Sequence, residues 1–178
     1  MAEAHLQLNL AFLPIEDRLL LRIASGASGR KEEYRLLLTR RLVRLLWDAL
    51  TRLAESYVLL NPHIPPEGKG ACLQFQQTAA LSQADFETPY TSEKVTAPLG
   101  PAPLLIYKFQ ASSGPKESRI ISLGATTGQV INLTLSLQLI HSFRKLLADM
   151  NREAGWDLHL DVILKDGDGS QETLRSIN

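Results

Sequence analysis

The chain of 178 residues has little of several features that would point to a particular class of protein. Its one cysteine, Cys72, cannot form an internal disulfide, which predicts a reducing, cytoplasmic environment. Its 19 basic and 19 acidic side chains cancel, which argues against a general nucleic-acid coat but leaves a local basic patch open. No apolar run approaches the roughly 20 residues that a membrane span needs. We therefore expect a cytoplasmic protein that does not use a membrane.

Sequence motifs that carry known chemistry are also missing. There is no GxSxG, no GxxxxGK and no visible Cys–His or Ser–His pair, although catalytic triads can assemble from distant residues. The histidines, His5, His63, His141 and His159, lack metal-ligand spacing, and we place His141 on the polar side of its helix. The sequence therefore predicts no catalytic, cofactor-binding or metal-binding residues, and an enzyme is the third of three functions that we consider.

What the chain does have is a strand that runs directly into a long helix, at 33–57. Tyr34, Leu36 and Leu38 recur with the period of two that is typical of a strand. Thr39 stands where the period changes, and its hydroxyl suits a helix N-cap. Beyond it, apolar residues fall three or four positions apart and form a broad stripe, which favours a helix that lies across a sheet. The main positions of this stripe are Leu42, Leu46, Leu50, Leu53 and Tyr57.

The same layout recurs 97 residues later. Ile131, Leu133 and Leu135 alternate, Ser136 takes the cap position, and an apolar stripe follows. Apolar type and cap type agree at all ten positions compared, which favours a structural internal repeat. Any strand–cap–helix unit would also match in this way once it is aligned on its cap, so this second explanation stays open.

These patterns predict an α+β fold, mainly an antiparallel sheet with two long helices and a pseudo-twofold repeat of a strands-then-helix unit. We divide the chain into a first β-β-β-α half at 1–60, a Pro-rich connecting segment at 61–103, a second β-β-β-α-β half at 104–164, and a polar tail at 165–178. These parts belong to one compact domain.

Individual elements are assigned from the same periodicities. The predicted strands cover 6–12, 18–23, 34–38, 104–110, 118–124, 129–135 and 157–164, and the second helix covers 137–154. Residues 25–31 are expected to form a hairpin loop. Within the connecting segment, we expect a short strand at 71–76 and a weak helix at 78–87.

Basic side chains gather at 18–52, which holds nine of them and three acidic ones. Such a surface could follow the phosphates of a nucleic acid. The ordinary alternative is a solvated sheet face, paired with acidic groups of the second half, and we favour it. Two of the basic residues also lie in a first helical turn, where positive charge opposes the helix dipole. The candidate anion or nucleic-acid contacts are Arg18, Arg22, Arg30, Lys31, Arg35, Arg40 and Arg41.

Part of the chain resembles a group of small bacterial proteins without an assigned activity. The residues that carry the resemblance are Arg22-Ile23, Glu33-Tyr34-Arg35, Leu38-Thr39-Arg40-Arg41 and Trp47. This resemblance covers about 35 residues and implies a bacterial cytoplasmic protein. The strands-then-helix halves are also similar in architecture to Whirly and PUR-type binders of single-stranded nucleic acid, which are built from two ββββα units.

From these observations we expect a non-enzymatic interaction or assembly module. An open sheet with strands as apolar as 6–12 needs its edge covered, and self-association or a protein partner would cover it. The runner-up is single-stranded nucleic-acid binding through the basic residues at 18–52.

Overall fold

The computed structural model describes residues 6–27, 30–59, 61–84, 95–113 and 119–160. Its elements, in chain order, are β1 (Gln7–Leu13), β2 (Arg18–Ala27), β3 (Arg30–Thr39), α1 (Arg40–Leu59), a 3-10 turn η1 (Pro66–Gly68), α2 (Lys69–Ser82), β4 (Val95–Thr96), β5 (Leu104–Ser113), β6 (Arg119–Ala125), β7 (Val130–Leu135) and α3 (Leu137–Glu153). The predicted α+β fold is confirmed, and so is the repeated strands-then-helix order.

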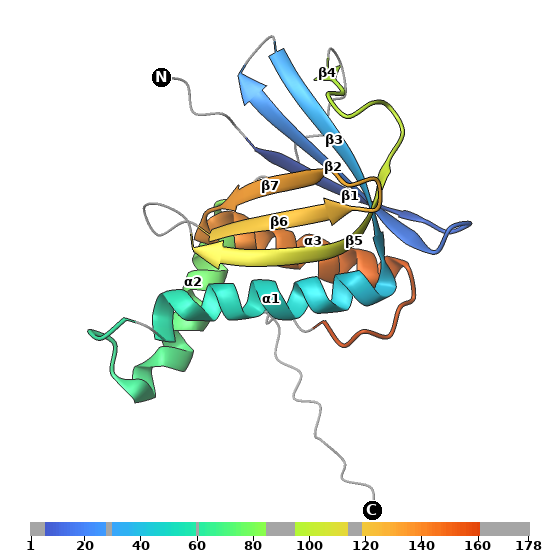
Figure 1. Ribbon diagram of the computed structural model, residues 1–178. Coiled ribbons are helices and arrows are strands. Elements are labelled where there is room, and N and C mark those ends of the chain that lie inside the picture. Colours follow the sequence, from blue (N-terminus) through green and yellow to red (C-terminus); the bar gives the residue numbers. More distant parts are fainter. Residues whose placement is uncertain (1–5, 28–29, 60, 85–94, 114–118, 161–178) are drawn as a thin grey trace, which may run out of the picture.

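The strands form one mixed, mostly antiparallel sheet of seven strands (Figure 1). β1, β2 and β3 pair antiparallel in sequence order, and β5, β6 and β7 do the same. A short parallel pairing of β3 with β5 joins the two groups, and β4 pairs parallel with the beginning of β3. The two halves of the chain therefore share one sheet, with three main strands in each half.

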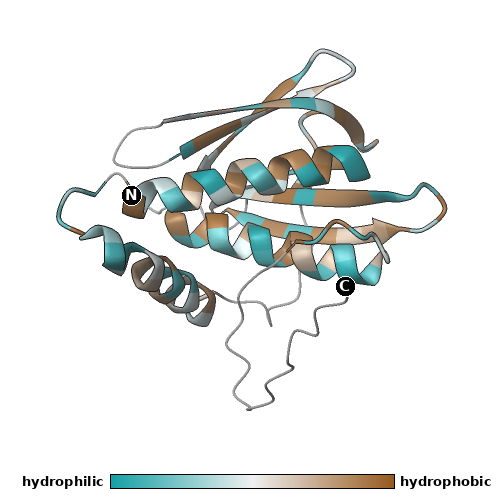
Figure 2. Cartoon of the chain, turned by 90° about the horizontal axis from the view of Figure 1, so that it is seen from below, coloured by the Kyte–Doolittle hydropathy of each residue, from teal (hydrophilic) through white to brown (hydrophobic). Residues whose placement is uncertain are grey.

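Helices α1 and α3 lie side by side beneath the sheet, and α2 packs against both of them (Figures 1 and 2). Their packing is crossed between the halves, because α1 contacts β3 and β5 whereas α3 contacts β7 and β1. The core accordingly contains fully buried side chains from both halves, such as Leu21, Leu46, Leu123 and Phe143. Neither half buries its apolar surface without the other.

The predicted caps begin both long helices. The Thr39 hydroxyl accepts a hydrogen bond from Leu42 N at 3.3 Å, and the Ser136 hydroxyl accepts one from Leu139 N at 3.2 Å. At the other end of α3, Gly155 has a φ of 63°, the left-handed conformation that glycine adopts at little cost. Strand, cap and helix follow one another without a linker in each half.

The connecting segment is more regular than the sequence indicated. The predicted strand at 71–76 is wrong, because these residues lie inside α2. Alanine, leucine and glutamine are good helix formers, and they outweigh the short alternation that suggested a strand. The predicted helix at 78–87 overlaps only the end of α2, and residues 85–87 lie outside the described residues.

Two strand predictions also change. The predicted loop at 25–31 is too long, because the β2–β3 ladder continues to the pair Ala27 and Arg30, which puts Arg30 and Lys31 in β3. Residues 157–160 form no strand, and the rest of the predicted last strand, together with the polar tail, lies outside the described residues. Among the described residues, no helix combines the length and the apolar character needed to span a bilayer.

Candidate functional site

The two halves meet at a seam where β3 lies beside β5. Leu36 pairs with Leu104 and Leu37 pairs with Leu105 in parallel register, so this seam is closed by backbone hydrogen bonding. The repeat predicts a second seam, because β7 is the counterpart of β3 and β1 is the counterpart of β5. We call the seam between β3 and β5 the closed seam and the seam between β7 and β1 the open seam.

The counterparts of the paired residues can be placed by the repeat offset. An offset of 97 residues takes Leu36 to Leu133 in β7. Followed through the strand registers, Phe109 of β5 corresponds to Leu8 of β1, and the counterparts of Leu104 and Leu105 precede residue 6, outside the described residues. Within the described residues β7 pairs only with β6 and β1 only with β2, so no pairing crosses this second seam in the part of the chain that the structure describes.

A cavity of about 480 Å³ lies along the open seam. It is bounded on one side by β7 and on the other by Leu6, just before β1, and by the inner face of β2 and β3. The two strands β2 and β3 extend beyond the helices (Figure 1). The volume of the cavity is in the range of small-molecule and peptide sites, and its walls combine apolar and polar side chains. The lining residues are Leu6, Ile23, Ser25, Glu32, Tyr34, Leu99 and the β7 residues Val130, Ile131, Asn132, Leu133 and Thr134.

The free edge of β7 has none of the features that usually prevent strand addition. Residues 126–136 contain no charged residue and no proline, and β7 pairs with β6 without a register shift. Its outward residues Val130, Asn132 and Thr134 are exposed, Val130 by 57%. Natural edge strands are commonly protected by charge, proline or a bulge, so β7 is suited to pairing with another strand.

The other unpaired strand positions are protected. β1 has no exposed residue, and Trp156 packs edge-on against Phe12 with 5.9 Å between the ring centroids. The Trp156 indole donates a hydrogen bond of 2.6 Å to Asp17 in the β1–β2 turn, which fixes the segment after α3 against β1. Beyond its pairing with β3, β5 carries a register shift and the exposed Lys108. β7 therefore differs from β1 and β5 at their unpaired positions.

One acidic side chain lines the cavity at the open seam. The Tyr34 hydroxyl donates a hydrogen bond of 2.9 Å to Glu32 Oε2. Burial raises the pKa of Tyr34, and the hydrogen bond to Glu32 and its negative charge raise this pKa further. A carboxylate beside apolar walls would favour a bound segment with a basic or hydrogen-bond-donating group at that position.

The predicted basic surface is only partly assembled. Arg22 and Arg35 lie directly opposite each other on β2 and β3, on the sheet face that the helices do not cover. Arg35 pairs with the buried carboxylate of Glu33 and also donates to Pro101 O at 3.2 Å. Arg18 lies 3.8 Å from Glu16. Three arginines on this face are thus accompanied by two carboxylates, which leaves little excess charge for binding phosphates.

The remaining candidate residues lie elsewhere. Arg40 forms an ion pair of 2.9 Å with Asp17 in the β1–β2 turn, and its guanidinium lies 5.3 Å from the centroid of the Trp156 ring. The negative charge of Asp17 therefore offsets the unfavourable positive charge at the start of α1. Arg41 is exposed in the same helical turn. Lys31 is opposite Gly26 in the β2–β3 ladder, and the side chain of Arg30 lies outside the described residues.

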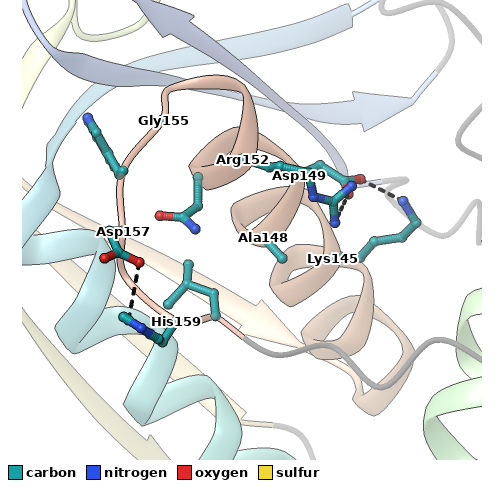
Figure 3. Close-up of a pocket in the computed structure, with 10 residues that line it drawn as sticks. Lys145, Ala148, Asp149, Arg152, Gly155, Asp157 and His159 are labelled. Atoms are coloured by element: carbon teal, nitrogen blue, oxygen red, sulfur yellow. Dashed lines mark hydrogen bonds and ion pairs between the residues drawn. The ribbon is translucent and has the colours of Figure 1, made fainter. Parts of the chain in front are cut away.

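A second cavity of about 500 Å³ lies at the end of α3 (Figure 3). Its charged groups are already paired with one another: Asp149 with Lys145 at 2.6 Å and with Arg152 at 3.7 Å, and His159 with Asp157 at 3.5 Å. Its opposite charges balance, so it offers a weaker basis for a site than the open seam.

The placement of His141 on the polar side of its helix is wrong. His141 is 3% exposed, because α3 is covered by the sheet on one side and by α1 and α2 on others. No group of three potential metal ligands occurs among the described residues. The chain matches no protein-family model, no curated protein and no solved structure in comparisons with all three. The resemblances inferred from short motifs therefore remain predictions.

Proposed function

We propose that this protein is a non-enzymatic interaction and assembly module that receives a β-strand from another chain along β7. The difference between the two seams supports the proposal most strongly. Among the described residues β3 is paired on both sides, whereas its counterpart β7 pairs only with β6 and borders a cavity with polar and apolar walls. Addition of a strand to a free sheet edge is a common mode of protein recognition, with backbone hydrogen bonds giving affinity and side-chain pockets giving specificity.

A second copy of the chain is the partner that we infer first. The uncharged sequence of β7 allows two copies to pair antiparallel about a twofold axis without bringing like charges together. In a pair centred on Asn132, Asn132 would face its own counterpart and Val130 would face Thr134 of the other copy, on the solvent side of a continuous sheet. Such pairing would also cover the most exposed apolar residue of the sheet edge, Val130.

The test compares variants with an added charge on β7 and in the adjacent turn. Light scattering after size-exclusion chromatography should show a mass that rises from monomer to dimer with concentration. The double variant Asn132→Lys/Thr134→Lys should remain monomeric at every concentration, because its added charges would face each other across the pair. Thr126→Lys/Thr127→Lys adds the same charge in the exposed β6–β7 turn and should still dimerise.

Three outcomes would contradict this proposal. A monomer at all concentrations would exclude the second copy as the partner. A dimer that persists in the β7 variant would place the interface elsewhere. Ultraviolet absorbance of nucleic acid that elutes with the protein at low salt and is lost at high salt would favour the basic surface of β2 and β3 instead.

A further inference from the structure

The pairing of β7 with β6 shows which of its backbone groups point to the other edge. In an antiparallel pair, residues that exchange backbone hydrogen bonds alternate along each strand with residues whose N–H and C=O groups point away. Ala125 N donates to Gln129 O at 2.8 Å, so every second residue from Gln129 onward bonds to β6. The backbone groups of Val130, Asn132 and Thr134 therefore point away from β6, and these residues line the cavity at the open seam.

The same three residues share one face of the sheet. Their side chains are exposed, whereas Ile131 and Leu133 between them are 6% and 3% exposed and belong to the core. A twofold axis perpendicular to the sheet would set two β7 strands antiparallel and keep the exposed faces of both copies on the same side. Pairs of this kind differ only in the residue through which the axis passes.

One register pairs all of these backbone groups within β7. With the axis through Asn132, this residue lies opposite its own copy, and Val130 lies opposite Thr134 on each side of the axis. An axis closer to the β6–β7 turn would put Gly128, whose φ is 95°, opposite one of them. An axis closer to α3 would put Ser136, the cap of that helix, in the pair. Both residues lie outside β7, so the register centred on Asn132 uses the strand most fully.

Asn132 is an uncommon residue for the middle of such a strand. Asparagine is depleted in strands, and Asn132 stands among apolar and β-branched residues in the sequence VINLTL. Its side-chain amide is both a donor and an acceptor, so two copies that face each other can hydrogen-bond to each other. A single asparagine fixes the register of coiled coils in a similar way. The local preference is thus broken at the residue through which the axis would pass.

The repeat offers a comparison for this position. In β3, 97 residues earlier, the counterparts of Val130 and Asn132 are an ion pair, Glu33 with Arg35. β3 is paired on both sides inside the chain, so its charges need not meet those of a second copy. An arginine at position 132 would face an identical arginine across the axis, and like charges that are directly opposite destabilise a pair of strands. Asparagine avoids this cost.

We propose that Asn132 lies on the twofold axis of a β7–β7 pair and makes this edge selective for a second copy of the chain. The inference rests on the proposed association through β7 and adds its register. Each Asn132 amide donates to the other and accepts from it on the outer face of the joined sheets. A strand with an apolar residue at this point would offer the amide no such partner.

Disulfide formation between single-cysteine variants measures the register. In the full chain with Cys72→Ser, a mixture of Val130→Cys and Thr134→Cys, one of them with a mass tag, should give a disulfide-linked heterodimer under mild oxidation. Opposite Cα atoms in a hydrogen-bonded pair lie about 5.5 Å apart, which suits a disulfide. Either variant alone should give almost none, because its two cysteines would be displaced by about four residues, or roughly 13 Å.

Substitution of Asn132 tests whether it selects this register. Asn132→Val supplies a good strand residue, so the two copies should still associate. The yield of the heterodimer between Val130→Cys and Thr134→Cys should fall on the order of fivefold, since one net hydrogen bond no longer favours the register. Thr127→Val makes a matched change in the exposed β6–β7 turn and should leave the yield unchanged.

Light scattering on the same samples separates a wrong register from a lack of association. The role of Asn132 is overturned, and the association through β7 is not, by a dimer in which Val130→Cys alone cross-links as readily as the mixture. A heterodimer yield that Asn132→Val does not change has the same consequence. A monomer at every concentration, with no cross-link in any mixture, overturns both proposals.

Discussion

The closed and the open seam are built from equivalent strands, but the strands are paired at the first and border a cavity at the second. At the closed seam, Leu36 and Leu37 of β3 pair with the start of β5. At the open seam, the equivalent part of β7 faces a cavity across from Leu6. The two halves thus repeat the same strand–cap–helix unit, yet among the described residues only one of the two edges that the repeat creates is paired. The proposed strand addition would take place at the other edge.

The crossed packing of the helices explains how one seam can stay open without loss of the core. α3 contacts both β7 and β1, so it holds the two strands of the open seam even though they do not pair with each other. Trp156 adds a second connection by fixing the chain after α3 to the β1–β2 turn. The buried side of the seam is therefore held by contacts that the proposed strand addition would not have to disturb.

Loss of the Trp156 contact should have the largest effect on this arrangement. Trp156 is 3% exposed, and we expect Trp156→Ala to lower the free energy of unfolding by about 3–5 kcal/mol, as for other buried aromatic side chains. Urea denaturation measures this change. Trp156→Phe keeps an aromatic ring against Phe12 and loses the hydrogen bond to Asp17, so its loss should be clearly smaller. A loss below about 1 kcal/mol for Trp156→Ala would show that β1 is held mainly by α3.

The next comparison uses equivalent leucines at the two seams. Leu36 is 0% exposed and has a paired strand on each side, whereas Leu133 is 3% exposed and has a strand on one side. We expect Leu36→Ala to cost about 2–5 kcal/mol and Leu133→Ala to fall at the lower end of that range, because fewer groups surround the cavity it leaves. Thermal and urea unfolding of the two variants measure how much each substitution lowers the free energy of unfolding. A larger loss for Leu133→Ala would mean that the open seam is the better packed of the two.

The smallest expected effect tests whether the two halves are equivalent. Thr39 and Ser136 cap α1 and α3 with hydrogen bonds of similar length. Thr39→Ala and Ser136→Ala should each lower the free energy of unfolding by about 1 kcal/mol. The double variant should lose the sum, since distant sites are usually additive. A strong departure from additivity would show that the starts of the two helices are energetically coupled.

Much of the fold could be predicted from the sequence because its signals are local. The alternation of Tyr34, Leu36 and Leu38, the change of period at Thr39, and the match 97 residues later are each sufficient to place an element. Interactions between distant residues could not be predicted. Nothing near Asp17 in the sequence indicates that it binds Trp156, and the spacing that put His141 on a polar side gives no information about the elements that pack around α3.

The candidate site was only partly predictable. The need to cover a sheet edge follows from the apolar strands, but the sequence does not identify β7 as the exposed edge, because that depends on strand order. The uncharged stretch at 126–136 was the available signal. The basic residues were the more visible pattern, and the structure separates them: Arg22 and Arg35 share a sheet face, whereas Arg40 binds Asp17.

The most direct test of strand addition is amide hydrogen exchange of β3 and β7 as the protein concentration rises, resolved by residue with NMR. β3 should be protected at every concentration because it is paired on both sides. The amides on the free edge of β7 should exchange quickly in the monomer and become protected as the mass measured by light scattering doubles. β7 amides that stay unprotected in the dimer, or that are already protected in the monomer, would contradict the proposed role of the open seam.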